Sequence, residues 1–138
     1  MSTLSLSKSS SELTEARLRV AMKFGKVTSH ESSTVVVLEK ALRLLVGTRD
    51  WRGRALILLC QAEACLTLNL QEGAVACLTL AENSSSRIED STLCQDIEQR
   101  IKLVIAQVGE QQFLEFRKHL AGQAEIIRGQ AMSRIAGK

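Results

Sequence analysis

Proline is absent from this chain, glycine is limited to eight residues, and aromatic side chains make up only 3% of the composition. Sandwiches and barrels need frequent turns built on glycine and proline, so the scarcity of both residues excludes an all-β fold. There is no tyrosine, and there is one tryptophan among 138 residues. The core must therefore consist of Leu, Ile, Val and Ala, which suits packed helices.

Long hydrophobic runs are missing as well. Apolar stretches such as Ala55 to Cys60 are far shorter than the roughly 20 residues that a helix needs to cross a bilayer. The first eleven residues are rich in Ser and Thr and contain no apolar run of signal-peptide length. The sequence predicts no membrane span and no cleavable secretion signal, and we expect a cytoplasmic protein.

The four cysteines offer enough thiols for two disulfides, but three of them lie inside apolar helical patterns in a chain large enough to fold without covalent links. Buried free thiols are the interpretation that we favour. No Cys-x-x-Cys pair occurs, and the two histidines, His30 and His119, are far apart in sequence, so the usual zinc spacings are absent. We predict neither a metal nor a cofactor.

Motifs of catalysis are not found in the sequence. The chain has no Gly-x-Ser-x-Gly turn and no glycine-rich phosphate loop. We therefore predict that it is not an enzyme and has no small-molecule substrate. The net charge of +3 is mild, and acidic residues are interleaved with basic ones. A basic helical protein that binds nucleic acid remains an alternative, although stacking aromatics are scarce.

Hydrophobic periodicity predicts about six helices in a single domain. Residues 1–10 are Ser-rich and are expected to form a flexible polar leader, and residues 11–138 the helical domain. Asp50 is predicted to cap one helix, and Asp90 or Ser91 another. The expected helices cover approximately 11–25, 33–46, 51–68, 71–82, 91–108 and 110 to near the C-terminus.

The last predicted helix carries a heptad-like apolar seam that something must cover. The seam either caps the helical stack of its own chain or forms an interface between chains, as a homo- or hetero-oligomer. Its members are Phe113, Phe116, Leu120, Ala124, Ile127, Ala131 and Ile135, and the opposite face carries Arg117, Lys118, Glu125, Arg128 and Arg134.

The segment from about Ala55 to Ser86 resembles a tetratricopeptide helix pair. Small residues stand where that family needs them for close helix approach, namely Ala62 in the first helix and Ala74 and Ala81 in the second. The chain departs from the family pattern at Leu58, Gln61, Cys65 and Ser86, where the family usually has Trp, Leu, Tyr and Pro. The resemblance implies antiparallel helical hairpins with tetratricopeptide-like packing and a concave surface lined by the first helices.

In size, helical content and short polar leader, the chain also resembles the small tetratricopeptide-like chaperones of type III secretion. That resemblance implies a chaperone that sequesters the amphipathic helix of a needle or pilus subunit, often with a small co-chaperone. The alternative is a regulatory protein that antagonises a transcription activator by direct binding, which would depend on the same burial of apolar surface with a different partner.

Two sets of residues are the candidates for partner contacts. The resemblance implies a groove formed by Leu58, Gln61, Ala62 and Cys65. An unusual cluster of arginines surrounds the only tryptophan, and Arg and Trp are enriched at binding hot spots. Further candidate contacts are Arg49, Trp51, Arg52 and Arg54, and Phe113, Phe116, Leu120 and Ile127 of the seam. The alternative for the cluster, which we favour for Trp51, is that this side chain folds back as a core anchor while the arginines face solvent.

Overall fold

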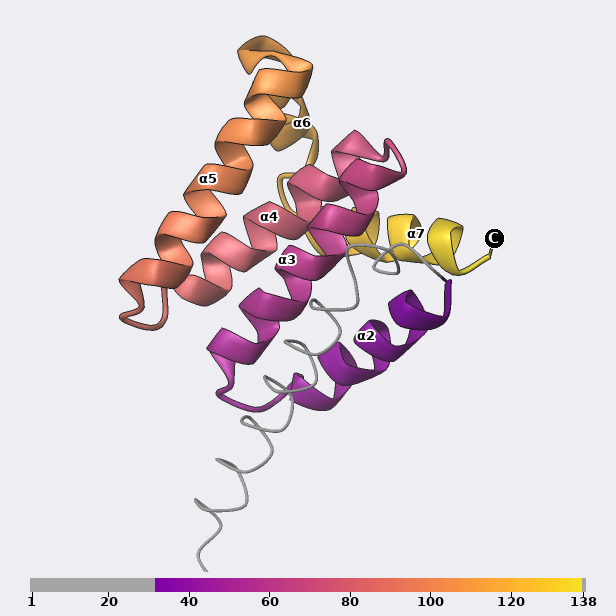
Figure 1. Ribbon diagram of the computed structural model, residues 1–138, viewed down its shortest axis with the longest axis vertical. Helices are drawn as coiled ribbons and strands as arrows, with labels where there is room; N and C mark the ends of the chain where they lie inside the picture. The colour runs from indigo at the N-terminus through magenta and orange to yellow at the C-terminus, as the bar shows by residue number, and fades with distance from the viewer. Residues whose placement is uncertain (1–31, 138) are drawn as a thin grey trace, which may run out of the picture.

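The computed structural model describes residues 32–137, and this part of the chain is helical without any β-strand (Figure 1). The prediction of an all-α fold is confirmed over these residues, which form six helices. The helices are α2 (Ser32–Leu45), α3 (Trp51–Thr67), α4 (Gln71–Ser85), α5 (Ser91–Val108), α6 (Glu110–His119) and α7 (Ala124–Ala136). The predicted leader and the predicted helix over 11–25 lie outside the described residues.

Helix α4 is the centre of the fold. It contacts α3, α5, α6 and α7, and its most extensive contact is with α3, which lies beside it in Figure 1. A helix that is covered on most sides has apolar or small residues around its whole circumference. In α4, every residue from Gly73 to Leu78 is buried. The sequence of α4 therefore suits a central position.

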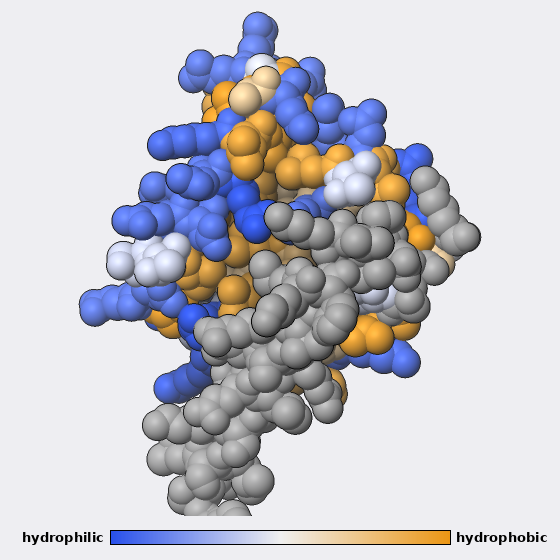
Figure 2. Space-filling view, in the orientation of Figure 1, coloured by the Kyte–Doolittle hydropathy of each residue, from blue (hydrophilic) through white to orange (hydrophobic). Residues whose placement is uncertain are grey.

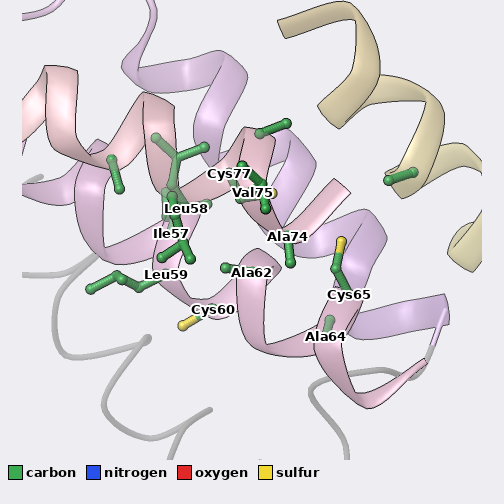
Figure 3. Close-up of a cluster of buried hydrophobic side chains, with 14 of the residues drawn as sticks. Ile57, Leu58, Leu59, Cys60, Ala62, Ala64, Cys65, Ala74, Val75 and Cys77 are labelled. Carbon is green, nitrogen blue, oxygen red and sulfur yellow. The ribbon is translucent and has the colours of Figure 1, made fainter. Parts of the chain in front are cut away.

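Small residues allow α3 and α4 to pack closely. Ala62, Ala74 and Ala81 are all buried, and Figure 3 shows Ala62 and Ala74 in the cluster of apolar side chains that joins the two helices. A Cβ atom placed on Gly73 would lie 2.7 Å from the Cβ of Ala131 and 3.2 Å from the Sγ of Cys65. Only glycine fits there without a shift of its neighbours. Tetratricopeptide-like stacking of this hairpin on others stays a prediction.

Two predicted N-caps are confirmed. The side chain of Asp50 accepts a hydrogen bond of 2.9 Å from the Gly53 amide at the start of α3. At the start of α5, Asp90 accepts one of 3.0 Å from the Leu93 amide. Each carboxylate satisfies an amide that has no partner within the helix.

The prediction of one continuous helix after residue 110 is wrong. Helix α6 ends at His119, and α7 begins at Ala124. Between them Gly122 has φ +74°, a left-handed conformation that glycine adopts without strain and that ends a helix. The break lets α6 and α7 both contact α4. The apolar seam is therefore used largely within the chain, with Phe113, Leu120, Ala131 and Ile135 buried.

The surface agrees with the helix patterns. On the face seen in Figure 2, hydrophilic side chains dominate the outer edge formed by α5, and hydrophobic ones gather towards the middle. Helix α5 buries Leu93, Ile97 and Val104 and exposes most of its charged residues. Within residues 32–137, no helix is both long enough and apolar enough to cross a membrane.

Candidate protein-binding groove between α2 and α7

An open groove of about 1220 Å³ runs between α2 and α7, and residues 69–73, from the α3–α4 turn and the start of α4, contribute to its wall. Pockets for small molecules usually have a volume of about 300–1,000 Å³. The size and openness of this groove suit a segment of polypeptide better. Its apolar lining includes Val36, Leu42, Val46, Phe116, Ile127 and Met132.

Helix α2 supplies one wall because apolar residues lie on more than one of its faces. Val35, Leu38, Leu42 and Leu45 are buried against the rest of the fold. Val36 comes next to the buried Val35 and points to another side of the helix. It is 40% exposed and lines the groove. Just after the helix, Val46 is 69% exposed. The exposed parts of these two side chains are available to a partner.

A buried ionic network joins the two walls. Arg128 of α7 donates hydrogen bonds to Glu39 of α2 and, at 3.1 Å, to the side-chain oxygen of Gln61 in α3. The amide nitrogen of Gln61 donates to the same Glu39 carboxylate at 2.6 Å. On its other side, Arg128 donates to both oxygens of Glu125, at 3.0 and 2.5 Å. The network fixes α7 on α2 and α3, and thus the width of the groove.

Arg128 remains charged in this environment. Burial lowers its pKa, but the hydrogen bonds and charges of Glu125 and Glu39 outweigh burial and raise the pKa above the ordinary value of arginine. The sequence pattern had placed Arg128 on the solvent face of the last helix. That interpretation is wrong, since its side chain is only 5% exposed.

The four residues expected from the family resemblance to line a groove are packing residues in this structure. Leu58, Gln61, Ala62 and Cys65 are each at most 4% exposed. They do not form an open concave surface, because the chain itself covers them. Gln61 still belongs to the site, since its side chain bonds to Glu39 and Arg128 beneath the groove.

The arginines around Trp51 have structural roles. Arg54 lies over the indole ring, 4.5 Å from its centroid, and donates to the Leu45 carbonyl at 2.7 Å and the Thr48 carbonyl at 3.1 Å. The bond to Leu45 satisfies a carbonyl at the C-terminal end of α2, and the bond to Thr48 holds the turn that follows. Arg87 lies 4.7 Å from the same ring. Trp51 is therefore half-buried between two guanidinium groups and belongs to its own fold.

The other two arginines of this cluster differ from each other. Arg52 forms an ion pair with Asp90 at 3.0 Å and so links the starts of α3 and α5. Arg49 is exposed in the turn that precedes α3. The sequence analysis treated the four residues of the cluster as one set. In the structure, Trp51 and Arg54 are packing residues, and Arg49 and Arg52 are exposed.

The four seam residues predicted as partner contacts differ in how far they are buried. Phe113 and Leu120 are buried, and Phe116 and Ile127 are half-buried. Phe116 and Ile127 line the groove, which brings one predicted residue from α6 together with one from α7. The seam thus mainly covers the core and in part lines the groove.

The cysteines are not arranged for chemistry. All four are free thiols; Cys60, Cys65 and Cys77 are buried, and Cys60 and Cys65 point in different directions (Figure 3). Burial, reinforced by the charge of Glu63, raises the pKa of Cys60 to about 11, and burial likewise raises the pKa of Cys77. Thiols with raised pKa values are poor nucleophiles. Over the described residues, no three His, Cys, Asp or Glu side chains gather as metal ligands would.

Sequence analysis missed Glu39, Arg128 and the exposed valines of α2 as a joint site. One signal was present: Gln61 is a long polar side chain within the otherwise apolar run from Ala55 to Ala62. A polar group in a buried helix needs a hydrogen-bond partner. The sequence does not say which element provides that partner.

Comparison of the chain with models of protein families, with curated proteins and with solved structures finds no match.

Proposed function

We propose that this protein is a small chaperone or adaptor that binds and sequesters a helical segment of a partner protein in the α2–α7 groove. The observation that carries the proposal is the groove itself, which is open, exceeds the usual size of a small-molecule pocket and is lined in part by apolar residues of α2, α6 and α7. An amphipathic helix that lays its apolar face in such a groove is a recurring mode of recognition.

The driving force would be burial of apolar surface on both partners. The exposed fractions of Val36 and Val46 are 40% and 69%, so both have surface left to bury. Each square ångström of apolar surface removed from water contributes about 25 cal/mol, less the cost of ordering the segment. A partner held in this way would stay soluble and unassembled until it is released.

The resemblance to type III secretion chaperones suggests one class of partner, a needle or pilus subunit, and a place in the cytoplasm. The same groove physics also fits an adaptor that restrains a transcription activator. Both proposals require a helical protein segment as the ligand.

A tagged pull-down with the full-length chain tests the proposal. Retained species are identified at moderate and then at high salt for the wild type, for the groove variant Val36→Gln/Val46→Gln and for Leu103→Gln. Leu103 is a matched control because it is 64% exposed on α5, outside the groove. Apolar burial is little screened by salt.

A helical protein that survives high salt with the wild type and with Leu103→Gln, but is lost from the groove variant, supports the proposal. Retention of nucleic acid that is released as salt rises would instead indicate the basic binder. Equal retention by the groove variant would exclude this groove as the binding site.

A further inference from the structure

The charged residues that line the groove differ in whether they have partners. Its carboxylates are Glu39, Glu72 and Glu125, and each already has a partner. Glu39 and Glu125 accept hydrogen bonds from Arg128, and Glu72 lies 2.7 Å from the Nδ1 atom of His119. Each of the three carboxylates therefore has a hydrogen-bond partner within the chain.

Its cations other than Arg128 have no ion-pair partner in the part of the chain that the structure describes. Lys40 and Arg43 on α2 and Arg134 on α7 are exposed and line the groove. None of the three has an ion-pair partner among residues 32–137. An occupant of the groove therefore meets three unpaired positive charges beside its apolar surface.

The two cations of α2, Lys40 and Arg43, are flanked by an apolar residue on each side, Val36 in the helix and Val46 just after it. Val36, Lys40 and Arg43 follow one another at steps of four and three residues, which keeps them on one face of α2, and Val46, three residues further on, lines the same groove just after the helix ends. The steps from Val36 to Val46 cover about 15 Å at 1.5 Å per residue. A second helix lying along this face rises at the same rate, so its complementary residues have the same spacing.

From this arrangement we infer that the groove takes an acidic amphipathic helix. The inference rests on the proposed function and specifies the chemistry of its ligand. The segment has an apolar residue, two carboxylates and a second apolar residue at successive steps of three or four, opposite Val36, Lys40, Arg43 and Val46. This order is the same read in either direction, so it holds for parallel and antiparallel docking.

The charge of the chain's own N-terminal segment argues against that segment as the occupant. Residues 1–31 contain five Lys and Arg and three Glu, which gives a formal charge of +2. A positive segment does not complement three unpaired cations. A separate, acidic partner does.

Two synthetic peptides of the same apolar pattern test the inference by fluorescence anisotropy with the full-length protein. One carries Glu at the two positions between the apolar residues, the other carries Lys, and a scrambled acidic peptide has the same composition without the amphipathic spacing. Each has about 15 residues, since shorter isolated helices are marginal in water. The protein variants are Lys40→Glu, Arg43→Glu and, as the matched control on α5, Lys102→Glu.

The acidic amphipathic peptide is expected to bind about ten-fold more tightly than the basic one at low ionic strength, and the difference should shrink as salt rises. Lys40→Glu and Arg43→Glu should each weaken binding of the acidic peptide and strengthen binding of the basic one. Lys102 is exposed and lies outside the groove, so Lys102→Glu should leave both affinities unchanged.

The remaining outcomes separate this inference from the proposed function. If both amphipathic peptides bind equally and better than the scrambled one, the acidic preference is wrong and a helix-binding groove stands. If neither binds better than the scrambled peptide, both fail. Sedimentation tests whether a second copy of the chain is the occupant. A dimer that persists with the acidic peptide but dissociates in the Val46→Gln variant would overturn the inference.

Discussion

Arg128 and Glu39, 89 residues apart in sequence, form a buried ion pair between α7 and α2. The side chain of Arg128 is 5% exposed and that of Glu39 is 19% exposed. Around this pair, Gln61 and Glu125 complete the hydrogen bonds of the guanidinium group. The pair connects the first and last helices of the described fold, and the groove lies between those helices.

Arg128→Met is expected to destabilise the protein by about 3 kcal/mol, because it leaves the partly buried Glu39 and the buried Gln61 without their charged partner. Urea denaturation measures this as a lower midpoint. Arg134→Met on the same helix is the control, since Arg134 is exposed and should change stability by about 0.5 kcal/mol at most. Equal midpoints for the two variants would mean that the network does not hold α7.

Gly73→Ala should cost about 1–3 kcal/mol, because the added methyl group has no room between α4, Ala131 and Cys65. Gly129→Ala provides the contrast. A Cβ atom there meets no atom within 4 Å, and alanine favours a helix interior, so we expect a gain of about 0.5–1 kcal/mol. Thermal unfolding of the two variants distinguishes these opposite signs. A neutral Gly73→Ala would contradict the close approach of α4 and α7.

Asp90 links stability to pH. Its hydrogen bond from the Leu93 amide and its pairing with Arg52 lower its pKa below the ordinary value of 3.8. The folded state therefore gains stability from Asp90 above pH 3.8 and loses it as pH falls through the lowered pKa. Asp90→Ala should cost about 1 kcal/mol at neutral pH through loss of the cap.

Urea midpoints at neutral pH and at about pH 2 measure this dependence. The difference between the wild type and Asp90→Ala should be largest at neutral pH and smaller in acid. A difference that is the same at both pH values would show that the ionised carboxylate contributes nothing.

The thiols should differ in their reaction with Ellman's reagent in the native protein. At pH 8, a pKa of about 11 leaves about one in a thousand Cys60 thiols ionised, and Cys65 and Cys77 are buried as well. Cys94 is half-buried and is expected to react first. One equivalent should therefore react quickly, and three more only when urea unfolds the chain. Rapid reaction of Cys60 in the native state would contradict its burial.

Local signals predicted much of this fold correctly. The caps at Asp50 and Asp90 depend on neighbouring residues, and the structure confirms them. The break near Gly122 was missed because the apolar spacing continues across it at steps of three and four. A single glycine at φ +74° changes the direction of the chain without disturbing that pattern.

The candidate site depended on contacts that no local pattern contains. Arg128 follows Ile127 in a helix whose charged residues otherwise face solvent, so periodicity assigned it to the surface. Its burial results from Glu39, which is contributed by a helix at the other end of the described chain. The predicted groove residues Leu58, Ala62 and Cys65 were expected to be open because the sequence does not show which helices cover them.

The most direct test of the account is an NMR titration of the full-length ¹⁵N-labelled protein with the acidic amphipathic peptide. We predict that amide shifts change mainly in residues 36–46 and 127–134, the two walls of the groove, and that the Val36→Gln/Val46→Gln variant loses these changes. Shifts concentrated on α5, or no specific shifts at saturating peptide, would contradict the central claim that the α2–α7 groove binds a helical segment.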